Sequence, residues 1–272
     1  MTSRPLYRTP SDHPGLGWHL RWRSTGDAPL APSPAARRVL AATTLEVGRH
    51  HGLFVFRAVD THVHVELATD DAGAAVFARR FAQACHARLG VTLEAERPKA
   101  FRDQWHRANT FAYVLGNDVH HGVATDPFHD ASLLPDLLGL RVTPHFSVGT
   151  VRELLPRLRR ADLVAFFGRE PPNTPGTSLD PLAESAAAAA GVGEMGSRAP
   201  EAVAARVAAV HAASAASDAA LAEALHIDRA TVWRLRQREP WKALVRAAGL
   251  QMALRAVPAP LERPAPVSSP AP

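Results

Sequence analysis

The sequence predicts an α+β domain, in which helices cover a small β-sheet, followed by an all-α region. In roughly the first 125 residues, segments in which apolar and polar residues alternate, as in a strand, are followed by segments with apolar residues at helical spacing. A Pro-rich linker at 170–181 ends this mixed pattern. The alanine-rich stretch beyond it has helical spacing only.

The predicted elements of the first region follow in order along the chain. Alternation of apolar and polar residues over Trp18–Arg23 predicts a strand. The stretch 52–68 is rich in β-branched and aromatic residues and predicts two strands that turn at Asp60-Thr61. Apolar residues at helical spacing predict helices over 36–48, 71–89 and 103–117.

These patterns divide the chain into four regions. We expect the α+β domain over 15–125 and an extension with a Pro-rich linker over 126–181. A helical region follows over 182–256, and the proline-rich end, 257–272, is expected to be disordered.

Composition limits the classes of protein to consider. A single cysteine among 272 residues excludes an intramolecular disulfide framework and a cysteine-built zinc site. The net charge of +5 makes nucleic acid a natural partner to test but does not establish one. No apolar run reaches the roughly 20 residues that a membrane helix requires, so we expect a cytoplasmic protein with no membrane partner.

A His-Val-His sequence lies in the second predicted strand of 52–68. Residues two apart on a strand project from one face, which places the Cα atoms of His62 and His64 roughly 6.5–7 Å apart. Two neutral imidazoles so placed can bind one divalent cation. Glu66 shares that face. A solvated polar strand face would produce the same pattern, and both interpretations stay open.

The predicted helix 103–117 carries a polar stripe. At 100° per residue, five polar side chains fall within about 40° of one another: His106, Asn109, Tyr113, Asn117 and His120. A helix face exposed to solvent would show the same polar stripe. However, a tyrosine and an asparagine four residues apart can direct a nucleophilic phenol and a metal-ligating oxygen to one point.

The strand with His-Val-His and the helix with Y-x-x-x-N about fifty residues later resemble a known family. The family is that of the HUH single-tyrosine transposases, in particular the REP-associated tyrosine transposases related to the insertion-sequence 200 family. The resemblance rests on 59–66 and 111–118 and covers roughly 15–125. Asp60-Thr61 stands where the family usually has Pro-Asn, and Asn117-Asp118 where it commonly has Asn-Pro.

The resemblance implies a ferredoxin-like antiparallel sheet with His-Val-His on a central strand. It implies that His62, His64 and Asn117 hold Mg²⁺ or Mn²⁺, and that Tyr113 attacks single-stranded, hairpin-bearing DNA to give a covalent 5′-phosphotyrosine. The expected function is therefore that of a transposase that nicks and rejoins single-stranded DNA, as a monomer or homodimer.

Two alternatives remain at this stage. A domesticated, non-catalytic DNA-binding regulator would keep the same fold. The segment Asp60–His64 also resembles the D-x-H-x-H start of zinc amidohydrolases. Their (β/α)₈ barrel needs about 250 residues of regular strand–helix alternation, whereas the alternation here ends near residue 125.

Residues 218–238 have the spacing of a helix-turn-helix. We expect Ala222 where the two helices touch, His226-Ile227 in the turn, and Val232 and Leu235 in the core. His226 stands where a positive φ favours glycine, at a cost of roughly 1 kcal/mol. The residues expected to face the major groove of duplex DNA are Arg229, Thr231, Arg234 and Arg238. An ordinary helical bundle with a basic face is the alternative.

Overall fold

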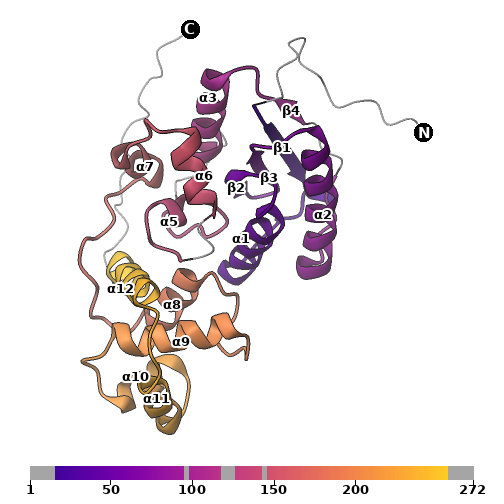
Figure 1. The fold of residues 1–272 in the computed structure, drawn as a ribbon. Coiled ribbons are helices and arrows are strands. Elements are labelled where there is room, and N and C mark those ends of the chain that lie inside the picture. Colours follow the sequence, from indigo (N-terminus) through magenta and orange to yellow (C-terminus); the bar gives the residue numbers. More distant parts are fainter. Residues whose placement is uncertain (1–15, 95–97, 118–125, 143–145, 257–272) are drawn as a thin grey trace.

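The structure is a computed structural model that describes residues 16–94, 98–117, 126–142 and 146–256 (Figure 1). It is an α+β protein with one four-stranded antiparallel sheet and a helical unit beside it, as the sequence predicts. The expected disordered tail, 257–272, and His120 lie outside the described residues. None of the helices in the described ranges is long and apolar enough to cross a membrane.

The sheet has the order β2-β3-β1-β4. Its strands are β1 (Trp18–Arg23), β2 (Leu53–Val59), β3 (His62–Leu67) and the short β4 (Lys99–Ala100). Each neighbouring pair is antiparallel. In this strand order β1 and β3 lie at the centre of the sheet. The zinc amidohydrolase alternative requires a closed barrel of eight parallel strands, and the described chain forms this open antiparallel sheet instead.

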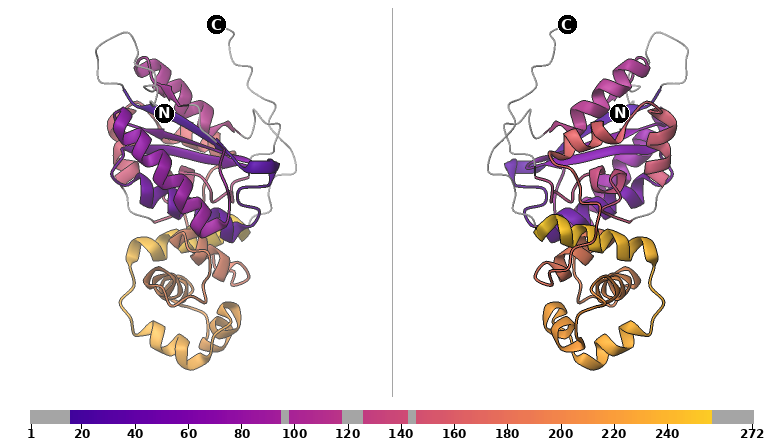
Figure 2. Two further views of the ribbon diagram at one scale, coloured as in Figure 1. Left: turned by 90° about the vertical axis from the view of Figure 1, so that its right-hand side faces the viewer. Right: turned by 90° about the vertical axis from the view of Figure 1, so that its left-hand side faces the viewer.

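Helices cover both faces of the sheet (Figures 1 and 2). On one face lie α1 (Pro34–Gly48) and α2 (Asp71–Leu89), whose N-termini are capped by side chains of Ser33 and Asp70. On the other face lie α3 (Gln104–Leu115) and α6 (Phe146–Leu154). Helices α1, α2 and α3 match the helices that the sequence predicts over 36–48, 71–89 and 103–117.

The two faces of β1 differ in polarity, as its alternating sequence predicts. Trp18, Leu20 and Trp22 are buried on the side of α1 and α2, where the Trp22 ring lies 4.8 Å from that of Phe81. The alternate side chains point toward α3. Of these, Arg21 pairs in register with His64 and Arg23 with His62. The face under α3 is therefore the polar one.

Part of the region expected to be an extension completes the core of the sheet. The backbone of Ala131 accepts a hydrogen bond from Ala58 of β2, and that of Leu133 donates one to Phe56. Two short helices follow, α5 (Leu134–Leu137) and α7 (Arg160–Phe167). The buried side chains of Leu133, Leu140, Val151 and Phe167 belong to the same apolar core as the strands. The boundary at residue 125 stays a prediction.

The helical unit has a second apolar core of its own. It consists of α8 (Leu182–Ala190), α9 (Pro200–Ala212), α10 (Asp218–Leu225), α11 (Arg229–Arg236) and α12 (Lys242–Ala256). His226 ends α10 with φ of 53°, the positive value that the sequence predicts at the turn. Val232 and Leu235 of α11 are buried and Ala222 packs in the same cluster, also as predicted.

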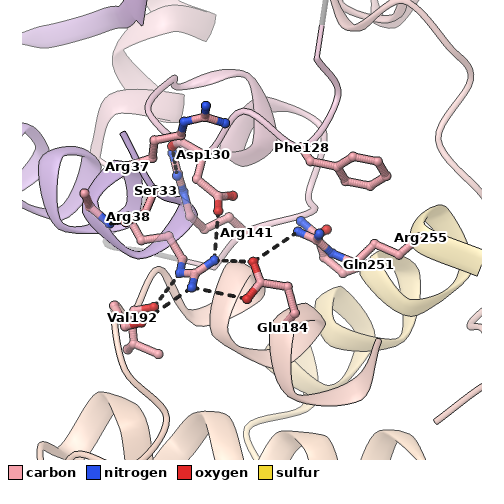
Figure 3. Close-up of polar contacts among 12 residues, drawn as sticks. Ser33, Arg37, Arg38, Phe128, Asp130, Arg141, Glu184, Val192, Gln251 and Arg255 are labelled. Atoms are coloured by element: carbon pink, nitrogen blue, oxygen red, sulfur yellow. Dashed lines mark hydrogen bonds and ion pairs between the residues drawn. The ribbon is translucent and has the colours of Figure 1, made fainter. Parts of the chain in front are cut away.

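A buried cluster of charges joins the two units (Figure 3). Arg38 of α1 is 3% exposed and forms ion pairs with Asp130 at 3.1 Å and with Glu184 of α8 at 2.6 Å. Its Nε also donates to the carbonyl of Val192 at 2.6 Å. Burial raises the pKa of Asp130, while Arg141 and Arg38 oppose that rise. Arg38 thus satisfies groups that would otherwise be buried without partners.

The neighbouring arginines Arg38 and Arg37 give a matched test of this buried ion pair. Arg38→Met keeps the apolar stem but leaves Asp130 without its ion pair, so we expect the free energy of unfolding to fall by about 3–5 kcal/mol. Arg37 pairs with Asp126 at 3.3 Å in a partly exposed position. Arg37→Met should therefore cost less than about 1 kcal/mol. Urea denaturation measures both, and equal losses would contradict a special role for Arg38.

Candidate functional site

The two histidines of the His-Val-His sequence lie side by side on the polar face of β3. His62 is 7% exposed and His64 is 1% exposed. Their ring centroids are 5.1 Å apart, at an interplanar angle of 72°. The period-two alternation of β3 sends Val63 and Val65 into the opposite, apolar side. The shared face that the sequence predicts is thus present.

Helix α3 places Tyr113 against this pair. Phe111, Val114 and Leu115 are buried in the core, which fixes the rotation of the helix about its axis. In that orientation the Tyr113 ring lies 5.6 Å from the ring of His64, at an angle of 78°. Asn117 follows the end of α3 and is fully buried. Its Nδ2 lies 3.5 Å from Nε2 of His62. The four residues that the resemblance singles out therefore meet in one place.

A third histidine, His19 of β1, belongs to the cluster and was missed by the sequence reasoning. Its Nε2 lies 2.9 Å from Nδ1 of His64, and the two rings stack at 12°. Burial, followed by the charge of Lys99, lowers the pKa of His19 to about 4. His19 is therefore neutral near pH 7. The contact between the two ring nitrogens orients the His64 imidazole.

A cavity of about 690 Å³ opens beside these rings. Its lining carries three cationic side chains, Arg21, Arg23 and Lys99, and one carboxylate, Glu94. The uncharged lining side chains are His19, His64, His106, Asn109, Thr110 and Tyr113. Three members of the stripe that the sequence predicts, His106, Asn109 and Tyr113, therefore face this cavity, whereas Asn117 is not in the lining and His120 lies outside the described residues. An anionic ligand, not a cationic one, suits such a lining.

His106 presents a defined hydrogen-bonding state to the cavity. Its Nδ1 accepts a hydrogen bond from the backbone N–H of Arg102 at 3.2 Å. Burial, followed by the charge of Arg102, lowers the pKa of His106, so the ring is neutral near pH 7. Because Nδ1 accepts, the proton resides on Nε2. His106 is thus a neutral hydrogen-bond donor on the cavity wall.

Glu66 shares the face of His62 and His64, and its carboxyl group is buried beneath that face. It is fully buried, and among the described residues its carboxyl oxygens have no hydrogen-bond partner. Burial raises its pKa well above the ordinary value, against the opposing charge of Arg107. This direction favours the protonated form, which is a poorer metal ligand than a carboxylate and carries no negative charge.

The residues present fit a divalent cation with few protein ligands. Oδ1 of Asn117 is buried and, within the described ranges, has no hydrogen-bond partner. Amide oxygen suits Mg²⁺ and Mn²⁺, and imidazole is tolerated by Mn²⁺. The described chain brings no three His, Cys, Asp or Glu residues together at metal-binding distance. A cation held by His62, His64 and Asn117 would therefore take its remaining ligands from water and phosphate.

In the second helix of the predicted helix-turn-helix, three of the four residues expected to face the major groove are exposed. Arg229, Arg234 and Arg238 are exposed, as expected for groove contacts. Thr231 is half-buried, and its hydroxyl donates to the N-capping Asp228 at 2.7 Å. Sequence reasoning missed Trp233, which is 58% exposed on α11.

Arg236 of α11 is used internally. Its Nε donates to Asp218 at 2.7 Å and its Nη2 to the carbonyl of Ala216 at 2.7 Å. The segment 229–246 contains six basic residues. One of them therefore holds α11 against the start of α10 and is not available to an external partner.

Comparison with known proteins gives one weak similarity. No protein-family model matches the chain, and no curated protein matches it. Among solved structures, the chain is similar to a REP-associated tyrosine transposase bound to a REP hairpin. The match has 17% sequence identity and covers 43% of this chain and 74% of that one. Its TM-score of 0.34 does not establish a shared fold.

The contact between His19 and His64 generates a test of metal binding. His19→Ala removes the group that orients His64, so we expect Mn²⁺ affinity to fall by about 10- to 100-fold. Isothermal titration calorimetry measures that affinity directly. His106→Ala is the control, since His106 lines the same cavity without a hydrogen bond to His64. An unchanged affinity in His19→Ala, or an equal loss in both variants, would contradict the positioning role.

Proposed function

We propose that this protein nicks and rejoins single-stranded DNA through a covalent 5′-phosphotyrosine on Tyr113, as the HUH single-tyrosine transposases it resembles do. One observation carries the proposal: His62 and His64, the Tyr113 ring and Asn117 meet beside a cationic cavity. The chain order β-α-β-β-α-β with sheet order β2-β3-β1-β4 supports it, because that is the ferredoxin-like arrangement.

The proposed reaction exchanges one phosphodiester bond for another. The phenol oxygen of Tyr113 attacks the phosphorus, a new O–P bond forms, and the bond from phosphorus to the 3′ oxygen breaks. The phenol loses a proton and the departing 3′ oxygen gains one. Rejoining is the reverse: a DNA 3′-OH attacks the phosphotyrosine and releases Tyr113. Because the energy of the broken bond is kept in the adduct, no nucleotide cofactor is needed.

The residues around Tyr113 bind the DNA and offset the negative charge of its phosphates. Arg21 and Lys99 offset the negative charge of the phosphates, and Nε2–H of His106 donates a hydrogen bond to an oxygen in the cavity. Mg²⁺ or Mn²⁺, held by His62, His64 and Asn117, would polarise the scissile phosphate. His19 keeps the His64 ring in one orientation.

The helical unit supports a second part of the proposal, which is binding to duplex DNA. Helices α10 and α11 are joined by the three-residue turn 226–228 and share a buried core. The outward side of α11 carries Arg229 and Arg234, with Arg238 following its end. This combination favours a helix-turn-helix that holds duplex DNA while the cavity holds the single strand. A monomer or homodimer remains the expected assembly.

Tyr113→Phe tests the covalent step. The variant removes one oxygen, so stability should change by less than about 1.5 kcal/mol, and affinity for DNA should persist. The covalent adduct should vanish. Labelled hairpin-bearing single strands are incubated with Mn²⁺ and run on a denaturing gel, and the adduct is assigned by peptide mass. A His62→Ala/His64→Ala double variant should also form none.

Two results would count against this assignment. An adduct formed by Tyr113→Phe would place the nucleophile elsewhere. A wild-type protein that binds these DNAs tightly but forms no adduct with any of them would favour the non-catalytic regulator instead.

Paired variants test the duplex contact. Arg229→Ala/Arg234→Ala should weaken binding of the full chain to duplex DNA. It should also flatten the plot of log affinity against log salt concentration, by about 0.9 for each phosphate that an arginine no longer neutralises. Fluorescence anisotropy over a salt series measures both effects. Arg152→Ala, an exposed arginine on α6, is the control and should leave both unchanged. An unaltered double variant would contradict duplex binding through α11.

A further inference from the structure

Trp105 is an exposed indole at the edge of the cavity. It is 74% exposed, more than Trp233 and Trp241, the other large apolar side chains exposed in the described chain. On α3 it lies four residues before Asn109, and residues at this spacing are neighbours on a helix surface. Asn109 lines the cavity, whereas Trp105 is not among the lining residues. By this spacing the indole lies beside the cavity, outside its lining.

The opposite wall of the cavity is cationic. Arg21 of β1 and Lys99 of β4 are exposed, and neither forms an ion pair within the described ranges. Glu94 is the one carboxylate in the lining. A flat apolar surface on one side and unneutralised cations on the other match the two chemical parts of a nucleotide, the base and the phosphate.

We propose that the groove between α3 and the β1–β4 edge binds single-stranded nucleic acid, with a base stacked on Trp105 and phosphates at Arg21 and Lys99. This inference deepens the proposed function, on which it rests for the choice of ligand. Trp105 lies eight residues before Tyr113, about 12 Å along the helix axis. That distance leaves room for nucleotides beside the one that reacts.

A single strand fits this surface better than a duplex or a protein. The bases of a duplex are stacked on each other, so their flat faces are not free to cover an indole at the side of a groove. A protein partner that covered Trp105 with apolar side chains would also bury the neighbouring cations, which is costly unless acidic groups pair with them. Unpaired bases cover the ring, while the attached phosphates neutralise the cations.

The experiment separates stacking from charge. Fluorescence anisotropy measures binding of a labelled oligo-dT, which has no hairpin, to the full chain carrying Tyr113→Phe, without divalent ions. Adding Trp105→Ala should lower affinity about tenfold or more and leave its salt dependence unchanged. Trp105→Phe, which keeps an aromatic face, should retain most of the affinity. Arg21→Ala or Lys99→Ala should instead reduce the salt slope by about 0.7 each.

Trp241→Ala is the matched control, an exposed indole of the helical unit, and should bind oligo-dT like the parent. Unchanged affinity in Trp105→Ala would overturn the proposal. So would a loss in Trp105→Phe as large as that in Trp105→Ala, or a Trp105→Ala effect seen only as a change of oligomeric state in sedimentation. Because no step here needs Tyr113 chemistry, the outcome is independent of whether the covalent adduct forms.

Discussion

The candidate site depends on the position of β3 between β1 and β2. Both neighbours are antiparallel to β3, and the register places Arg21 of β1 and Arg57 of β2 opposite His64. Because side chains alternate between faces, this register sends every apolar side chain of β3 toward α1 and α2 and every polar one toward α3. A slip of one residue would exchange the two faces. The buried Val63 and Val65 therefore hold the histidines in place, although they take no part in the chemistry.

Burying the polar face has an energetic cost, and two of its groups respond to burial in the same direction. His19 and Glu66 both have their pKa values shifted by burial toward the uncharged form. The cations Arg21, Arg23 and Lys99 lie at the open side of the face, where they line the cavity. Negative charge brought in by a ligand is thus met by cations.

Local sequence patterns predicted most of the helices and strands. The residues whose roles were not predicted depend on contacts between segments that lie far apart in the sequence. The alternation of β1, the pairing of His62 with His64 and the positive φ of His226 all follow from neighbours along the chain. The role of His19 required knowing that β1 pairs with β3, which no local pattern shows. Arg38 is another case, because it occupies an ordinary helical position until Glu184, 146 residues away, packs against it. Thr231 could have been assigned from its spacing to the N-capping Asp228.

The buried joint at Arg38 has a consequence for any DNA that contacts both units. Arg38 of α1 forms an ion pair with Glu184 and donates to the carbonyl of Val192 in the helical unit, and other orientations of the two units would break these contacts. In the observed orientation α11 and α3 lie at opposite ends of the molecule, as both views show (Figures 1 and 2). A duplex held by α11 therefore cannot place its immediately adjacent nucleotides at Tyr113. Under the proposed function, a DNA that engages both units must span the length of the protein, or each unit must hold a different segment.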